Sequence, residues 1–131
     1  MNNKVLEFLS ILKTASISKK TDLVRVENTR RVLICVEKMY EEGLILYYTL
    51  EKLEDDKKSY IKIKLREIDG DFITKKIKIV SKKKRNYYFT YEEICKLNTK
   101  NKDYFFYTDR GFVTLRTCQL KRLGGLLAFQ I

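Results

Sequence analysis

Hydrophobic positions in the first half of the chain switch between helical and strand-like spacing. Apolar residues recur every three or four positions, as in amphipathic helices, in two stretches: Val5, Phe8, Leu9 and Leu12, then Val32, Cys35, Val36, Met39 and Tyr40. Asn28 or Thr29 can cap the second helix, and Gly43 suits the left-handed residue that often ends a helix. Strand-like segments follow the helices at 23–26, 44–50 and 60–66. The pattern therefore predicts the order α-β-α-β-β.

The second half is richer in short strands, with two short helices among them. Strand-like segments occur at 73–80, 86–89, 104–107 and 112–113, and a last one follows Gly124-Gly125. Thr90-Tyr91-Glu92-Glu93 has the form of a capping box and predicts a short helix through Leu97. Thr114 can cap another helix over 115–121.

Asp69-Gly70-Asp71 has the composition of a turn and marks the boundary between two predicted lobes. We predict an α+β fold with an N-terminal α/β lobe over 1–68. The C-terminal lobe, over 69–131, should contain mostly antiparallel strands and short helices. A chain of 131 residues with 44% hydrophobic residues is large and apolar enough for such a core.

The net charge of +11 and the pI near 9.6 indicate a polyanionic partner, namely RNA, DNA or an acidic membrane surface. The alternative is a surface whose charge serves only solubility. The sequence has no apolar run of about 18 residues, as a membrane-spanning helix requires. Its start has neither a secretory core nor an arginine-rich leader. We therefore expect a protein that acts where it is made, or whose leader has been removed.

The cysteines and the absence of histidine argue against a metal site and against catalysis. Cys35, Cys95 and Cys118 are isolated, so we expect no zinc site and interpret them as buried thiols in a reducing compartment. Without histidine the chain lacks the commonest general base. Glu41-Glu42 and Glu92-Glu93 are adjacent carboxylates that diverge on a helix, so they are interpreted as surface charge. We expect no enzyme, no cofactor and no small-molecule substrate.

The turn Thr108-Asp109-Arg110-Gly111 is the first candidate for RNA contact. It combines a hydroxyl, a guanidinium and a glycine that permits close backbone approach. An ordinary hairpin turn would have the same pattern.

Two further basic stretches are weaker candidates. The run Lys82, Lys83, Lys84 and Arg85 lies next to Tyr87-Tyr88-Phe89, where an exposed aromatic ring can stack on a base or a ribose. Lys62, Lys64 and Arg66 form a one-sided stripe on the predicted strand over 60–66. A solvated loop, a core strand and a solvent-facing sheet surface are the plainer interpretations.

Taken together, these segments resemble the small-subunit ribosomal protein S-eight family. The family signature is a Ser-Thr-x-x-Gly turn, an aliphatic pair with threonine, a short helix and Leu-Gly-Gly before the last strand. It is similar to 107–114 and Leu123-Gly124-Gly125 here, without a gap in spacing. Ser81–Phe89 resembles the family's basic loop and tyrosine-bearing strand, Phe8–Lys13 its opening helix, and Glu41–Ile45 a helix end.

The resemblance implies a two-lobe α/β protein that binds a stem in the central domain of small-subunit rRNA and helps that domain assemble. It assigns RNA contact to the turn residues Tyr107, Thr108, Asp109, Arg110 and Gly111, to Tyr88, and to the helix-end positions Lys13 and Arg30. Partners would be the rRNA and neighbouring small-subunit proteins, without a membrane. The alternative is an RNA-binding or translational regulatory protein outside the ribosome.

Departures from the family pattern suggest a fast-evolving member. Tyr107 replaces the first signature serine, Asp109 a hydroxyl residue, and Leu126 an acidic residue; Lys83-Lys84 replaces Pro-Gly. We expect Asp109 to accept a hydrogen bond from a base, a ribose hydroxyl or Arg110 rather than to face phosphate. Abundant Lys, Ile, Asn, Tyr and Phe without Pro or Trp are typical of AT-rich coding. We therefore predict a mitochondrial ribosome, with a plastid or bacterial cytoplasm as alternatives.

Overall fold

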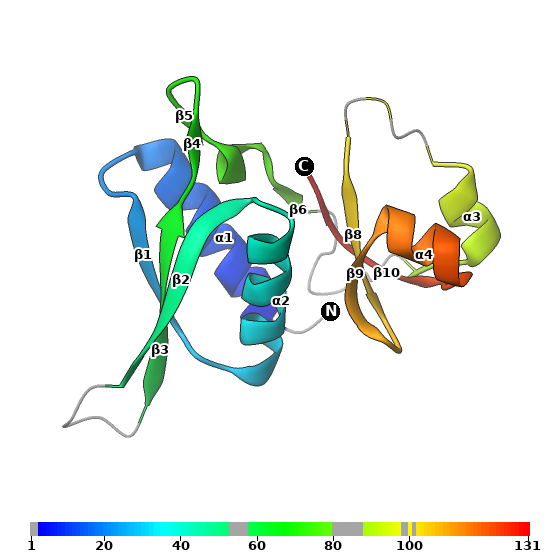
Figure 1. The fold of residues 1–131 in the computed structure, drawn as a ribbon, viewed down its shortest axis with the longest axis horizontal. Coiled ribbons are helices and arrows are strands. Elements are labelled where there is room, and N and C mark those ends of the chain that lie inside the picture. Colours follow the sequence, from blue (N-terminus) through cyan, green and yellow to red (C-terminus); the bar gives the residue numbers. More distant parts are fainter. Residues whose placement is uncertain (1–2, 53–57, 80–87, 98–99, 101) are drawn as a thin grey trace. The chain divides into compact units, whose positions relative to one another are not determined.

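The computed structural model describes residues 3–52, 58–79, 88–97, 100 and 102–131 (Figure 1). Its α+β fold consists of two compact units, as predicted, that divide between Lys76 and Ile77. The boundary predicted from the sequence is after residue 68. The segment between the two positions belongs with the N-terminal unit because its elements contact the first helix.

The N-terminal unit has the predicted order α-β-α-β-β. Its elements are α1 (Asn3–Ser18), β1 (Leu23–Glu27), α2 (Arg30–Glu41), β2 (Ile45–Lys52) and β3 (Ser59–Leu65). The three strands form an antiparallel sheet in the order β1-β3-β2. Both helices cover one face of this sheet (Figure 1). Buried side chains of the helical stripes pack there against Val24, Val26, Ile61, Ile63 and Leu65.

The ends of α2 are formed by the local signals that the sequence contains. Thr29 is the N-cap, and its side chain accepts a hydrogen bond from the Val32 N–H at 3.4 Å. Gly43 has a φ of +75°, and its N–H donates to the Tyr40 carbonyl while the Leu44 N–H donates to that of Met39. These two bonds make a Schellman ending, as the glycine predicted.

The N-terminal unit ends with a hairpin and a helical turn. Two short strands, β4 (Glu67–Ile68) and β5 (Asp71–Phe72), flank Asp69 and Gly70, which both have positive φ as in a two-residue type I′ turn. The predicted strand over 73–80 was wrong in its first half, where η1 (Ile73–Lys76) is a 3₁₀ helix and β6 (Lys78–Ile79) is short. Thr74 is fully buried, and its hydroxyl lies 2.5 Å from that of Ser16 on α1. This tertiary contact overrides the strand-like alternation.

The C-terminal unit has a five-stranded antiparallel sheet in which β10 pairs with three neighbours. After β6 its elements are β7 (Tyr88–Phe89), α3 (Tyr91–Cys95), β8 (Tyr104–Thr108), β9 (Gly111–Thr114), α4 (Leu115–Lys121) and β10 (Gly125–Gln130). Helices α3 and α4 cover one face through a core of Ile94, Tyr104, Phe106, Val113, Leu115, Cys118 and Leu127 (Figure 1). On the other face, the rings of Phe105, Phe112 and Phe129 are stacked.

The cysteines depart from the prediction at one position. Cys35 and Cys118 are buried as expected, and burial raises the pKa of both thiols, that of Cys118 to about 11. Cys95 is instead exposed, because it lies on the outer side of the short helix α3 while its neighbour Ile94 enters the core. None of the described helices has the length and apolar character needed to cross a membrane.

Candidate nucleic-acid interface

The predicted turn is the loop of a tight hairpin between β8 and β9. Thr108 pairs with Gly111, so only Asp109 and Arg110 lie between the strands, and both are exposed. Both have negative φ, whereas Gly111 has a φ of +99°. Glycine is favoured at such a position because it lacks the Cβ that makes positive φ costly. The sequence Thr-Asp-Arg-Gly therefore presents two charged side chains at the tip of a closed loop.

Thr108 holds this loop together with its hydroxyl. The hydroxyl donates to the Gly111 carbonyl at 3.0 Å and accepts from the Arg110 N–H at 3.0 Å. A threonine hydroxyl has one proton and two lone pairs. In this conformation its proton is committed to the loop, so one lone pair is left for an RNA donor. The role of Thr108 is then mainly to position Arg110.

The side chains of Asp109 and Arg110 do not neutralise each other. Within the described part of the chain, neither residue forms a side-chain ion pair. Of the three hydrogen-bond partners expected for Asp109, Arg110 is therefore not used in this structure, and a base or a ribose hydroxyl remains. The Arg110 guanidinium keeps its five donors in a planar fork, the arrangement that binds phosphate in a bidentate way.

Gly124 and Gly125 let the start of β10 lie closely against β7 on one side and β8 on the other. A Cβ at Gly125 would lie 2.5 Å from the Tyr107 carbonyl oxygen, and one at Gly124 would lie 2.8 Å from the Phe89 carbonyl oxygen and 2.9 Å from the Tyr88 hydroxyl. Neither glycine has a positive φ, so space rather than backbone conformation requires them. From the sequence, the glycine pair was expected only as part of the family signature, with no predicted contact in space. Two glycines at the start of a predicted strand could have indicated that another backbone approaches closely there.

Three signature positions form one row across the sheet. Leu126 of β10 pairs with Tyr88 of β7 on one side and with Tyr107 of β8 on the other. Directly paired residues in antiparallel strands project from the same face. Tyr107 is half-buried with its ring 5.0 Å from that of Phe112, whereas Tyr88 is 62% exposed. Of the two tyrosines, Tyr88 is the one that can stack on a ribose or a base.

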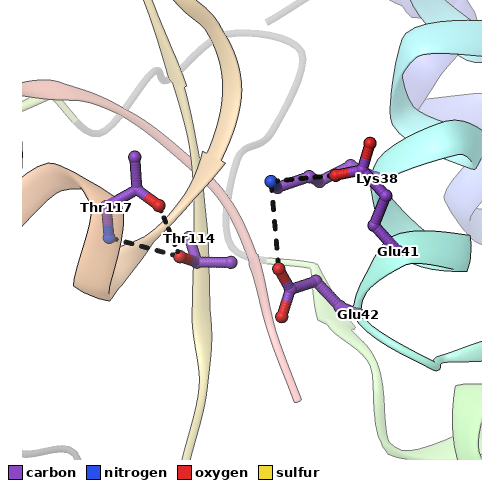
Figure 2. Close-up of polar contacts among 5 residues, drawn as sticks. All are labelled: Lys38, Glu41, Glu42, Thr114 and Thr117. Atoms are coloured by element: carbon purple, nitrogen blue, oxygen red, sulfur yellow. Dashed lines mark hydrogen bonds and ion pairs between the residues drawn. The ribbon is translucent and has the colours of Figure 1, made fainter.

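Helix α4 follows the hairpin directly. Thr114 is its N-cap and accepts a hydrogen bond from the Thr117 N–H at 3.3 Å; the two hydroxyls lie 3.2 Å apart (Figure 2). Its exposed cations are Arg116, Lys121 and Arg122. The segment from Ile77 to Ile131 contains twelve lysines and arginines against four aspartates and glutamates, which gives it +8 of the total charge of +11.

The remaining predicted positions lie elsewhere. Lys13 and Arg30 belong to the N-terminal unit, where Arg30 is the first residue of α2 and exposed. Lys13 is half-buried and not at a helix end as expected, because α1 continues to Ser18. The run Lys82, Lys83, Lys84 and Arg85 lies outside the described residues.

Two of the three cations in the predicted basic stripe, Lys64 of β3 and Arg66 just after it, are engaged within the protein. Lys64 forms an ion pair with Asp22, and this hydrogen bond lowers the pKa of the Asp22 carboxyl. Arg66 donates from Nη1 to the Gly43 carbonyl at 3.0 Å. On the neighbouring strand, Arg25 pairs with Glu51 at 3.0 Å and lies over the Tyr60 ring. These contacts support the plainer interpretation of the stripe as a sheet surface.

Comparison with known proteins decides the family. A family model described as Ribosomal protein S8 matches residues 3–131. The chain belongs to the ribosomal protein S8 family. A search of curated proteins found no match. As an S8 protein it is a component of the small ribosomal subunit that binds rRNA and lies among other small-subunit proteins. The S8 family is structural and non-enzymatic, and among the described residues no cluster suits a metal ion.

Proposed function

We propose that this S8 protein binds a stem in the central domain of small-subunit rRNA through its C-terminal unit and supports the assembly of that domain. The observation that carries the proposal is the β8–β9 hairpin, where Thr108 fixes a loop that presents an unpaired Arg110 guanidinium. Arg110 binds phosphate, Tyr88 stacks on a ribose or an unpaired base, and Asp109 accepts from a base or a ribose hydroxyl. Gly111 takes the positive φ that closes the loop, and Gly124 and Gly125 let β10 pack closely against β7 and β8 and so position Tyr88 and the hairpin.

The proposed interface includes positions beyond the hairpin. Tyr107 supports the hairpin by packing its ring against that of Phe112. The second lone pair of the Thr108 hydroxyl accepts a hydrogen bond from the RNA. Lys13, Arg30 and the run Lys82, Lys83, Lys84 and Arg85 add phosphate contacts, following the S8 resemblance. Neutralisation of phosphates by such residues releases counterions, which favours binding at low salt.

We further propose that the protein works in a mitochondrial ribosome. Its composition, rich in Lys, Ile, Asn, Tyr and Phe and without Pro or Trp, supports an AT-rich organelle genome. Sedimentation of a mitochondrial extract tests this directly, since the protein should move with the small subunit. Recovery with plastid or bacterial small subunits would change the compartment, and recovery away from any ribosome would favour a regulatory RNA-binding protein.

Arg110→Ala tests the interface itself. We expect it to weaken binding to the cognate rRNA stem by about 1–3 kcal/mol in a filter-binding assay, because a charged bidentate contact is lost. Arg25→Ala is the matched control: it also removes an exposed arginine, but one that is already paired with Glu51. Equal affinities of the wild type and Arg110→Ala would remove the hairpin arginine from the interface.

A further inference from the structure

The C-terminal half of α2 and the edge strand β2 form a surface that is apolar where the rest of the protein is basic. Tyr40 of α2 and Leu50 of β2 are exposed large apolar side chains on the helix-covered side of the sheet, whereas the exposed Tyr47 pairs with Lys64 and projects from the other face. Strand β2 is at the edge of the order β1-β3-β2, and no other strand of the described chain pairs with it. One side of its backbone therefore offers a row of free N–H and C=O groups to another strand.

This surface is also acidic. The C-terminal end of α2, with its C-cap, places three carboxylates around Lys38, namely Glu37, Glu41 and Glu42. Arg66 donates to the Gly43 carbonyl just beyond them. Lys38 pairs with Glu41 at 3.2 Å and with Glu42 at 3.8 Å (Figure 2), whereas Glu37 has no ion pair within the described residues. Carboxylates near a helix C-terminus are opposed by the helix dipole. Helix stability therefore does not explain why a chain of net charge +11 concentrates acids here.

The acids and the apolar side chains are neighbours. The Tyr40 ring packs edge-on against the Tyr48 ring at 5.7 Å. Glu37 lies one helical turn before Tyr40 on α2 and Glu41 directly follows it, so both acids flank the residue that contacts β2. Desolvation, and then the charges of Glu37, Tyr40 and Glu41, raise the pKa of the Tyr48 phenol. Tyr48 and Leu50 pair with the buried residues Ile63 and Ile61, and thus face the helices. We call Glu37, Tyr40, Glu41, Tyr48 and Leu50 the acidic edge.

We propose that the acidic edge binds an extended, lysine- and arginine-rich segment of a neighbouring small-subunit protein, which pairs with β2 as a fourth strand. Strand addition uses backbone hydrogen bonds for affinity and alternate side chains for specificity. Here apolar side chains of the segment would cover Leu50 and Tyr48, and its cations would meet Glu37 and Glu41. The proposal rests on the proposed function, because it places the partner in the small subunit.

Charge decides between this partner and two others. A nucleic-acid backbone would meet the carboxylate of Glu37, which has no ion pair among the described residues, beside two carboxylates that share the one cation Lys38, and would be repelled. A second copy of the chain pairing β2 with β2 would bring two acidic edges together, again with like charges. A basic protein segment is the occupant that gains from both features of the surface.

Site-directed crosslinking in assembled small subunits tests the proposal. The photoreactive amino acid benzoylphenylalanine is placed at Leu50, which is 58% exposed on β2, and as a control at Ile68, which is 48% exposed on β4. We expect the Leu50 probe to crosslink to a lysine- and arginine-rich segment of one other small-subunit protein, identified by mass spectrometry. The Ile68 probe should not reach that segment.

A charge reversal adds a second readout. Glu37→Lys should lower the yield of this crosslink about fivefold, the equivalent of about 1 kcal/mol, because a basic segment now meets a cation. Glu67→Lys reverses an exposed acid on β4 that also has no ion pair within the described residues, and should leave the yield unchanged. Circular dichroism of each variant checks that the fold is retained.

Crosslinks from Leu50 to rRNA, to a second copy of the chain or to nothing would overturn the proposal, as would insensitivity to Glu37→Lys. Sedimentation of the same samples separates two kinds of failure. If the chain sediments with the small subunit but the Leu50 probe misses a basic segment, the acidic edge alone is assigned wrongly. If the chain does not sediment with the small subunit, the proposed function fails as well.

Discussion

Two departures from the S8 signature are coupled through a single contact. The resemblance places a serine where this chain has Tyr107 and an acidic residue where it has Leu126, two positions 19 residues apart in sequence. In the sheet they are direct partners on β8 and β10. A polar pair has thus been exchanged for an apolar one at a position next to Tyr88. Within the proposed hairpin interface, the polar contacts with RNA then fall to Asp109, Arg110 and the remaining lone pair of Thr108.

Gly125 makes the sharpest prediction at this scale. Gly125→Ala should lower the free energy of unfolding by about 2–3 kcal/mol, because an added Cβ would meet the Tyr107 carbonyl at 2.5 Å and force β8 and β10 apart. Urea unfolding followed by circular dichroism measures this change.

Gly70→Ala is the matched control for Gly125→Ala. A Cβ at Gly70 meets nothing within 4 Å, but its φ of +85° makes any side chain strained. It should cost only the conformational strain of about 1–2 kcal/mol. A Gly125→Ala variant as stable as the wild type would mean that β10 can move away from β8 freely.

At the scale of elements, the sequence predicts what local interactions determine. The capping box of α3 forms as written: Thr90 Oγ1 accepts from the Glu93 N–H and the Glu93 carboxylate accepts from the Thr90 N–H. The turn at Asp69-Gly70 forms because both residues tolerate positive φ. The 3₁₀ helix over 73–76 depends on the buried contact between Ser16 and Thr74, 58 positions apart, which no local pattern contains.

The candidate site was predictable to the same extent. The hairpin loop and its charged tip follow from Thr-Asp-Arg-Gly between two apolar strands. The sequence does not show which lysines and arginines remain available for RNA, because an ion pair such as Lys64–Asp22 joins residues that are distant in sequence. The same holds for Gly124-Gly125, whose function depends on carbonyl groups of two other strands.

Helix α4 has an ending that local rules disfavour, and this yields a prediction for an element. Arg122 adopts left-handed backbone angles, φ 54° and ψ 49°, and the Leu123 N–H donates to the Cys118 carbonyl, an arrangement that favours glycine. Arg122→Gly should therefore raise the free energy of unfolding by about 0.5–1 kcal/mol, less than the full left-handed strain because glycine also loosens the unfolded chain.

Arg116→Gly provides the matched control for α4. It also exchanges an exposed arginine for glycine, but inside the helix, where glycine costs about 1 kcal/mol relative to good helix formers. Opposite signs for the two variants in thermal unfolding would confirm the backbone explanation. Destabilisation by both would show that the Arg122 side chain stabilises the unit.

Over the whole molecule, charge is distributed unevenly between the two units. The N-terminal segment through Lys76 has sixteen basic and thirteen acidic residues, a net charge of +3, against +8 for the rest. Ion pairs such as Lys19–Asp71, Arg25–Glu51 and Lys64–Asp22 join residues within the N-terminal segment. Six of its lysines and arginines pair with carboxylates, whereas Arg110, Arg116 and Lys121 of the C-terminal unit form no ion pair among the described residues.

This asymmetry predicts which lysines and arginines control the salt dependence of RNA binding. The double variant Arg116→Gln/Lys121→Gln should reduce the slope of log affinity against log salt concentration by about 1–2, because two phosphate contacts and their released counterions are lost. Lys19→Gln/Lys75→Gln removes the same net charge from residues that pair with Asp71, and should change the slope by less than about 0.5.

Filter binding of each double variant to the cognate rRNA stem over a series of salt concentrations gives the two slopes. Equal reductions would mean that RNA responds to net charge alone and that the protein has no preferred RNA face. A larger effect of the Lys19/Lys75 variant would place the RNA on the N-terminal unit. A larger effect of the Arg116/Lys121 variant would place α4 beside the hairpin in the interface, because only unpaired cations near phosphate release counterions when the complex forms.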